Sequence, residues 1–490
     1  ELRGNPMEHN EKLEAILKIA TALSYEKDHN KLFDLIIGKS MELTNCDAGT
    51  LYMYRGNMLE FRIMKTLSMG VSKGENGEKI DLPPVKMSEE NICSYSAIHK
   101  ETLNIANVRE SDRFDFSGPK KYDEITGYNT VSMMVVPLIN DDDEVVGVLQ
   151  LINALDDEGN VTVFDNAAEK IVYALGSLTA VAVSNIRYQE EIKEQMWSFT
   201  EAMAAAIDER TPYNASHTRK VAKYSGMLAD YINELHAKGE EEEFFTENRK
   251  EQLVMGAYLH DIGKLAVPLS VMNKATRLNG REKEISDRFE IYALKAHVAM
   301  LEGKISKEQY EDVKSETEEA KELMNRVNGA GFVDEETRTV LARVLDYVYN
   351  DTDGTMHPFF TDEEKECLRI VKGTLTGEER KIMESHVEIT ERILSKVHFN
   401  KYFAKSPVYA AQHHECLNGK GYPKGLTAED LSTDARIMAV ADICDALLAT
   451  DRPYKKPIPK EKAFDIMRDM ARAGNIDAKL VEYLYQCIDR

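Results

Sequence analysis

The sequence has few features that tie a chain to an oxidising compartment or a membrane. Its six cysteines are scattered along 490 residues, without a CxxC pair or the spacing of a disulfide framework. Its apolar runs, such as residues 133–139 and 178–183, are far shorter than the roughly 20 residues that cross a bilayer. No charged and then apolar leader precedes them. We therefore expect a cytoplasmic protein with reduced thiols and no membrane partner.

Positive charge is also scarce. The chain has 62 basic and 85 acidic residues, which gives a net charge of -23. Such a surface repels phosphate backbones and anionic lipids, so the charge excludes a protein whose main role is to coat nucleic acid. A small anionic ligand would need a local basic pocket. The length of 490 residues predicts two or three domains.

The first third of the chain has the pattern of a mixed domain. Apolar residues at three- and four-residue steps predict helix over about residues 10–45, and alternation on both sides of residues 55–57 predicts a hairpin. Residues 130–139 and 144–152 predict two further strands around an acidic turn, and a helix begins at about Asn166. This order, with segments 127–130 and 146–153, resembles a GAF sensory domain over residues 10–188. The resemblance implies an antiparallel sheet flanked by helices.

The ligand of this first domain stays open. GAF domains that bind cyclic nucleotides carry an Asn-Lys pair, then a Phe, then Asp-Glu. The matching positions here are Asn153, Ala154, Phe164, Ala168 and Glu169, so the lysine and the aspartate are missing. This difference argues against a cyclic nucleotide and leaves dimerisation or another signal as interpretations.

A long helix is predicted between the domains. Apolar residues recur every three or four positions from Val181 to Met203, with charged residues between them, which predicts a linker helix over residues 181–209. We expect a homodimer through the GAF domain and this helix, as a parallel two-stranded coil. The alternative is a single helix that packs against its own effector domain.

Beyond Arg210 the sequence is almost wholly helical in pattern. Capping boxes at Thr361–Glu364 and Thr376–Glu379 mark two helix starts. The expected fold class is therefore α+β, with an all-α region over residues 210–490.

Two adjacent pairs of metal-type ligands stand out in this helical region. One is His260-Asp261, with Lys264 one turn beyond, and the other is His413-His414, followed by a glycine-rich loop. Such nitrogen and oxygen donors beside a lysine indicate a metal centre that handles phosphate rather than a structural site. A two-metal phosphodiesterase needs about six or seven ligands. The other candidates are His217, His386 and Asp442.

This ordered set resembles the HD superfamily of metal-dependent phosphohydrolases, and the triplet Gly421-Tyr422-Pro423 resembles the signature of its HD-GYP subclass. The resemblance implies hydrolysis of a cyclic dinucleotide, cyclic di-GMP above all, to the linear dinucleotide or GMP by a hydroxide shared between two metals. It assigns one metal to His217, His260, Asp261 and Asp442, and the other to His386, His413, His414 and the same Asp261.

The resemblance also implies substrate contacts and metal identity. Lys264 would bind a phosphate oxygen and stabilise transition-state charge. The other expected substrate-binding residues are Gly421, Tyr422, Pro423, Arg452 and Lys455. Iron or manganese suits a shell of imidazoles and carboxylates, and zinc is an alternative. Tyr213 occupies the position of a glutamate that holds a third metal in some family members, so we expect two divalent ions.

One ligand required a choice. His386 lies 125 positions after Asp261, which indicates an insertion of about residues 280–370, and His297 inside that insertion is the rival ligand. We favour His386 because its flanking residues and capping box fit the family. The insertion is a lid, a dimer contact or a partner platform, and the sequence does not distinguish these roles.

The leading hypothesis is a cyclic di-GMP phosphodiesterase regulated by its GAF domain. The alternatives are a module that binds the dinucleotide without cleaving it and a phosphodiesterase that prefers cyclic GMP-AMP. A nucleotidase acting on mononucleotides fits less well because of the Gly421-Tyr422-Pro423 loop.

Overall fold

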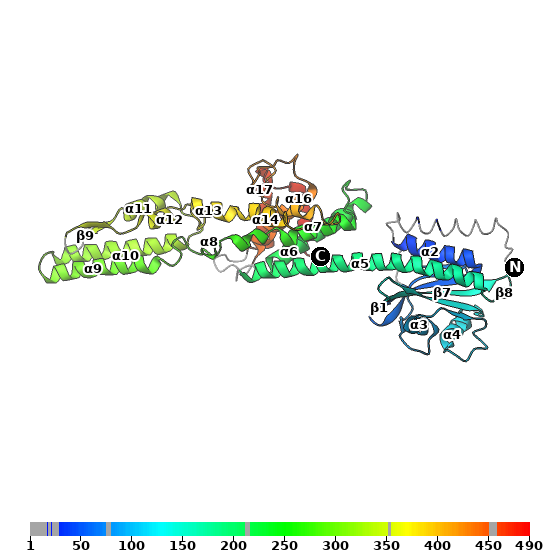
Figure 1. The fold of residues 1–490 in the computed structure, drawn as a ribbon. Coiled ribbons are helices and arrows are strands. Elements are labelled where there is room, and N and C mark those ends of the chain that lie inside the picture. The colour runs from blue at the N-terminus through cyan, green and yellow to red at the C-terminus, as the bar shows by residue number, and fades with distance from the viewer. Residues whose placement is uncertain are drawn as a thin grey trace. The chain divides into compact units, whose positions relative to one another are not determined.

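The chain folds into two compact units in this computed structural model, Glu1–Gln195 and Met196–Arg490 (Figure 1). The structure describes residues 17, 21, 29–74, 80–210, 216–350, 354–449 and 458–490. Each unit has hydrophobic core clusters of its own. The combination of a sheet in the first unit with helices in the second confirms the α+β class.

The first unit is built on one antiparallel sheet in the order β3-β2-β1-β7-β6-β5, with β4 beside β2 and β8 beside β7. Its elements are α2 (His29–Thr44), β1 (Cys46–Arg55), β2 (Met58–Thr66), β3 (Val71–Lys73), β4 (Val85–Lys86), α3 (Ile92–His99), β5 (Leu103–Ile105), α4 (Ser117–Thr126), β6 (Met133–Ile139), β7 (Val145–Leu155), β8 (Val161–Thr162) and the part of α5 (Asn166–Arg210) up to Gln195.

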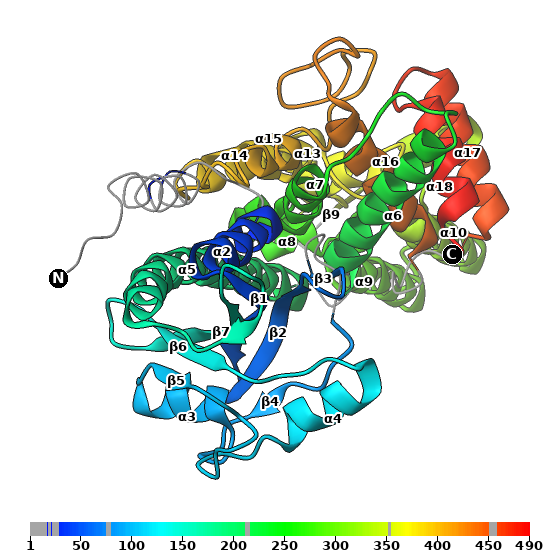
Figure 2. The ribbon, with the colours of Figure 1, turned by 90° about the vertical axis from the view of Figure 1, so that its right-hand side faces the viewer.

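Both faces of this sheet are covered, because its strands alternate between two apolar clusters. Leu51 and Leu149 point to the cluster that α2 and α5 share, whereas Tyr52 and Val148 point to the cluster that contains α3. Figure 2 shows α2 and α5 on one face of the sheet and α3 and α4 on the other. The expected hairpin is confirmed: Gly56 and Asn57 have φ of 53° and 63°, the left-handed pair that a two-residue turn requires.

Helix α5 is one continuous element of 45 residues. The closing helix expected from Asn166 and the linker expected over 181–209 are thus parts of the same helix. Its best 18-residue window has a mean hydropathy of 1.2 and is 50% buried, so among the described residues this helix alone meets a length and composition test for a membrane span. The helix expected over residues 10–45 is seen as α2, while most residues before 29 lie outside the described part.

The second unit has a helical body. Its core joins Val221, Leu253, Ile437, Phe464 and Leu484 from five helices. The body contains α6 (His217–Ala237), α7 (Glu247–Leu259), the 3-10 helix η1 (Ile262–Ala266), α8 (Leu269–Met272), α13 (Gly377–Glu384), α14 (His386–Leu394), α15 (Ser406–Ala410), α16 (Thr433–Leu448), α17 (Lys460–Arg472) and α18 (Ala478–Cys487).

The residues between α8 and α13 form a separate subdomain around buried Phe289, Met324 and Phe360. Arg277, fully buried, donates hydrogen bonds to the carbonyls of Ile370, Val327 and Ala330 and so ties the two ends of this insertion together. Its elements are α9 (Glu282–Leu301), α10 (Lys307–Gly329), α11 (Glu335–Leu345), β9 (Val348–Asn350), β10 (Met356–Pro358) and α12 (Asp362–Leu368).

The all-α expectation for residues 210–490 is wrong at one place. Strands β9 and β10 pair as an antiparallel ribbon, which three-residue strands do not reveal through periodicity. Tyr349 of this ribbon packs its ring on Phe359, with the ring centroids 5.2 Å apart. Both predicted capping boxes are present, at Thr361 and Thr376.

Candidate metal centre

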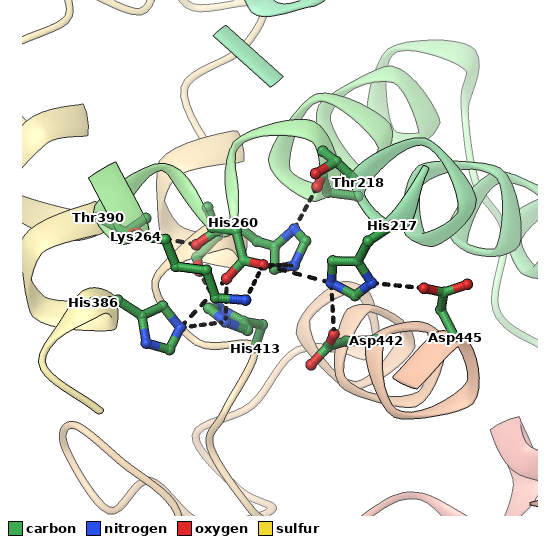
Figure 3. A network of polar contacts seen from close by, with 12 residues as sticks. His217, Thr218, His260, Lys264, His386, Thr390, His413, Asp442 and Asp445 are labelled. Atoms are coloured by element: carbon green, nitrogen blue, oxygen red, sulfur yellow. Dashed lines mark hydrogen bonds and ion pairs between the residues drawn. The ribbon is translucent and has the colours of Figure 1, made fainter. Parts of the chain in front are cut away.

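Five imidazoles and two carboxylates from distant parts of the second unit meet at one point. Figure 3 shows the labelled members of this group, with His217, His260, His386 and His413 turned toward a common centre. They come from the first residue of α6 (His217), the end of α7 (His260, Asp261), the first residue of α14 (His386), the turn after α15 (His413, His414) and the middle of α16 (Asp442).

Asp261 stands between two groups of ligands. Its Oδ2 lies 3.2 Å from His260 Nε2 and 3.5 Å from His217 Nε2. Its Oδ1 lies 3.4 Å from His386 Nε2 and 3.9 Å from His413 Nε2. One carboxylate therefore presents one oxygen to each group, the arrangement of a bridging ligand.

The remaining candidates complete the two groups. Asp442 Oδ1 lies 3.2 Å from His217 Nε2, and Asp442 Oδ2 lies 4.0 Å from His414 Nδ1. Donor atoms within 4.8 Å of one another form three sets, which are His217, His260, Asp442, then His386, His413, His414, and then His260, Asp261, His413. Each set could hold a metal ion. The first two contain the ligands that the resemblance assigns to each metal apart from Asp261, and the third takes ligands from both.

Hydrogen bonds on the far side of each ring fix the histidine tautomers. The Nδ1 atoms of His260, His386 and His413 lie 2.6, 2.6 and 2.7 Å from the backbone carbonyls of Ala257, Met383 and Ala410. A carbonyl only accepts, so each Nδ1 donates and each Nε2 keeps its lone pair for the centre.

Asp445 performs the same task for His217, and the sequence analysis missed it. Its Oδ2 accepts a hydrogen bond of 2.7 Å from His217 Nδ1. The available signal was its position three residues after Asp442, on the same side of a helix.

Two ligand atoms at the centre are buried without a hydrogen bond. His260 Nε2 and Asp261 Oδ1 make no hydrogen bond in the described structure, although neither atom is exposed to solvent. An unpaired buried polar atom costs about 1–3 kcal/mol. The donor set therefore fits a divalent cation, which would satisfy both atoms.

Burial keeps most of the imidazoles neutral. Loss of hydration lowers the pKa of His386, lowers that of His413 far more, and brings that of His414 to about 4. Neutral rings at neutral pH are ready to bind a cation.

The carboxylates and His217 behave in the opposite way. Burial would raise the pKa of Asp261, but the electrostatic influence of His260 and Lys264 and a hydrogen bond from His217 outweigh it and hold the pKa far below its usual value. Burial likewise opposes the charge of His217, yet hydrogen bonds to Asp261, Asp442 and Asp445 raise its pKa to about 11. The carboxylates of the cluster are therefore ionised, and a bound cation would neutralise their negative charge.

Close backbone packing holds the two halves of the site together. A Cβ added to Gly263 would lie 1.9 Å from the carbonyl oxygen of His386. The Thr390 hydroxyl donates to the His260 carbonyl at 3.0 Å and accepts from the Gly263 amide at 2.9 Å. The turn that carries Asp261 is thus joined directly to the helix that carries His386.

The loop after His414 lies against the centre. The Tyr422 ring sits 4.9 Å from the His414 ring, and burial raises the pKa of its hydroxyl. Gly421 is required because an added Cβ would lie 2.5 Å from the Cα of Glu415. The buried Glu415 carboxylate in turn accepts from the amides of Lys424 and Leu426 at 2.7 and 2.8 Å.

Other predicted residues have different placements. Lys264 Nζ lies 2.5 Å from Asp261 Oδ2, so it contacts the central carboxylate. His297, the rival to His386, lies on α9 and stacks on Tyr310 with ring centroids 5.0 Å apart. The predicted residues Arg452, Lys455 and Tyr213 lie outside the described residues.

The first unit contains a cavity of about 420 Å³ beside β1, β2 and β7. Tyr52 donates to Gln150 Oε1 at 3.0 Å within its wall. Lys65 is the basic residue of the described lining, and its Nζ pairs with Asp34 at 2.5 Å. The described wall therefore offers little positive charge to a phosphate group.

Family comparisons divide the chain in the same way. Residues 28–183 match the GAF domain, residues 214–348 match the HD domain, and residues 365–480 match a second HD domain description. The insertion lies across the end of one HD match and the start of the other.

Curated relatives match shorter stretches. A 3'3'-cGAMP-specific phosphodiesterase 3 from Vibrio cholerae is 40% identical over 97 residues, which are 20% of this chain and 20% of that protein. A cyclic di-GMP phosphodiesterase from Thermotoga maritima is 42% identical over 98 residues, or 19% of this chain and 24% of that protein. The matched stretch thus spans only about a fifth to a quarter of these relatives.

Among solved structures, the GAF domain of a phosphoenolpyruvate-protein phosphotransferase from Coxiella burnetii is similar to 38% of this chain and 99% of that chain, at 13% identity and a TM-score of 0.31. The family matches, the sheet order and the histidine cluster agree on the same two parts. Residues 28–183 therefore form a GAF domain, and HD-domain matches cover residues 214–348 and 365–480 of the same chain.

Proposed function

We propose that this protein is a metal-dependent phosphodiesterase that hydrolyses cyclic di-GMP to the linear dinucleotide or GMP. The single observation that carries the proposal is Asp261, which presents one oxygen to each of two histidine groups at 3.2–3.9 Å. A site with two such groups suits phosphodiester cleavage, and the HD region is similar to relatives named as phosphodiesterases of 3'3'-cGAMP and of cyclic di-GMP.

We assign one cation to His217, His260, Asp261 and Asp442 and a second to His386, His413, His414 and Asp261, with iron or manganese as the expected ions. When bound, the ions supply Lewis acidity and an activated water for attack on phosphorus.

The protein residues bind and orient the substrate. Lys264, which is 19% exposed at its side chain, can exchange its contact with Asp261 for a phosphate oxygen and stabilise negative charge there. Tyr422 presents its ring beside His414, where it forms a wall for a base, and Gly421 and Pro423 shape the same wall. Arg452 and Lys455 remain predicted phosphate contacts.

Cyclic GMP-AMP is the second candidate substrate. Relatives named for each dinucleotide match at nearly equal identity, 40% and 42%. Both substrates present the same phosphodiester to the metal centre, so the residues that contact the bases must decide between them.

The test is to load the protein with iron without oxygen, or with manganese, and follow both dinucleotides by chromatography. We expect cleavage by the wild type and by His236→Ala, which changes an exposed histidine at the opposite end of α6 from His217. A variant with His260→Ala and Asp261→Ala should lose turnover. Tight binding without cleavage under both metals would instead support a binding module.

Lys264→Ala should retain metal but react about 100-fold more slowly.

The proposal includes a homodimer formed through α5, the helix that joins the GAF domain to the HD region. Val181, Tyr188, Ile192 and Phe199 are 48, 40, 51 and 54% exposed along α5 at spacings of seven, four and seven, which suits a homodimer through this helix. Trp197 and Ile207 on the same helix pack within the second unit. The helix can therefore pack on its own effector domain and still pair with the same helix of a second copy.

In light scattering, Ile192→Glu should lower the mass of the full chain, whereas Tyr173→Glu, exposed at a position off this line, should not. An unchanged mass would reject the coil.

The described wall of the GAF cavity favours a ligand other than a cyclic nucleotide as its signal. The reduced cysteines agree with a cytoplasmic location.

A further inference from the structure

The insertion carries an exposed apolar line along α9. Ile291, Leu294, Val298 and Leu301 are 53, 61, 51 and 72% exposed. Single exposed apolar residues are common on protein surfaces. Four on one side of one helix, each more than half exposed, call for a separate explanation.

These residues follow heptad spacing. The steps of three, four and three place β-branched Ile291 and Val298 at one seam position and Leu294 and Leu301 at the other. The opposite side of α9 is already occupied, because Ile285 and Phe289 are buried in the core of the insertion. Helix α9 therefore packs its own subdomain on one side and presents a coiled-coil seam on the other.

Charge along the seam favours one orientation. Glu284 and Asp287 continue the line toward the start of the helix. Lys304 follows its end and lies 2.6 Å from Glu302 of the same chain. Parallel pairing in register would place each of these acids against its own copy. Antiparallel pairing about the midpoint between Leu294 and Val298 carries the acidic end of each helix past Leu301 of the other copy, toward its Lys304.

We propose that α9 pairs antiparallel with α9 of a second copy of this chain, so that the insertion is a contact between copies. Leu294 of one copy then packs on Val298 of the other, and Ile291 packs on Leu301. A seam of two heptads is small beside the about 800 Å² per partner of a standard interface. The pairing is therefore weak alone and is strengthened when another contact already holds two chains together.

Single cysteines in the full chain test this contact directly. Leu294→Cys and Val298→Cys are made separately with tags of different mass, and each protein alone and their mixture are treated with diamide. We expect a disulfide-linked pair in the mixture, joined through positions 294 and 298, and little linkage of either protein alone. Near-ultraviolet circular dichroism checks that each variant is folded.

The controls separate specific contact from collision. Val340→Cys lies on α11 at 46% exposure and should form few links, as should the wild type, whose described cysteines are buried except for the half-buried Cys416. Adding Leu301→Glu to the Leu294→Cys chain should reduce linkage several-fold. The proposal is overturned if the mixture links no better than Val340→Cys, or if Leu294→Cys alone links as well as the mixture, which would mean parallel pairing.

Discussion

At the scale of single residues, the site depends on side chains that do not themselves face its centre. Three histidines are oriented by backbone carbonyls within their own turns, which local helix geometry supplies. His217 begins its helix, and its Nδ1 donates to the side chain of Asp445. The metal affinity of this half of the site should therefore depend on one carboxylate that is not a ligand.

We expect Asp445→Asn to weaken metal binding about 10- to 100-fold, because a neutral amide orients His217 less firmly and makes it less basic. Competition with a fluorescent chelator measures the affinity. Asp465→Asn, whose side chain is 71% exposed on α17, is the matched control. Equal affinities in the two variants would show that Asp445 has no such role.

The protonation of His217 predicts how metal binding depends on pH. Its pKa of about 11 means that the metal-free imidazole carries a proton at neutral and mildly alkaline pH. A cation at Nε2 must displace this proton, so affinity should rise about tenfold per pH unit while the pH stays below that pKa.

Calorimetry in two buffers of different ionisation enthalpy should detect the release of about one proton per bound ion at this half of the site. A heat of binding that is the same in both buffers would contradict the prediction.

At the scale of elements, the site depends on the contact between η1 and α14. Gly263 lets the turn after Asp261 touch the first residue of α14, and Thr390 joins the two by hydrogen bonds on both sides. This contact sets the separation between Asp261 and His386, and hence the relation between the two ligand groups.

Gly263→Ala should therefore lower the free energy of unfolding by about 1–3 kcal/mol through overpacking and should also reduce the metal content. Thermal unfolding and elemental analysis measure the two effects. Gly377→Ala is the control, since an added Cβ there has open space at the start of α13. A normal metal content in Gly263→Ala would show that the contact does not position the ligands.

At the scale of the whole molecule, the second unit combines an HD body with an insertion that has its own core. Phe289 is 1% exposed in that core, and its ring stacks on Phe359 with centroids 5.0 Å apart. The insertion and the body each have a hydrophobic core of their own. The insertion should therefore be able to open locally while the metal centre stays intact.

Phe289→Ala should lower the stability of the insertion by about 3–5 kcal/mol. Limited proteolysis should then cut within residues 280–370 while the metal content remains that of the wild type. Phe332→Ala, at a site 64% exposed, should resist proteolysis like the wild type. Loss of metal together with cleavage would mean that insertion and body unfold as one unit.

Local patterns in the sequence predicted much of this organisation. The hairpin at Gly56-Asn57, the capping boxes and the adjacent ligand pairs all depend on residues within a few positions of one another, where spacing alone carries the information. The sequence pattern did not predict the ribbon β9–β10, because each of its strands has three residues, too few to show a period. The ribbon packs on Phe359 through Tyr349, a contact that sequence spacing does not reveal.

The sequence by itself therefore determined which nitrogen and oxygen ligands are available at the centre, because adjacent histidines and carboxylates indicate metal chemistry in any fold. Their division between the two oxygens of Asp261, the support of His217 by Asp445 and the exposure of the α9 line were decided only when the chain folded. The physical reason is distance: His217 and Asp445 are 228 positions apart, and packing of α6 against α16 is what brings them within a hydrogen bond.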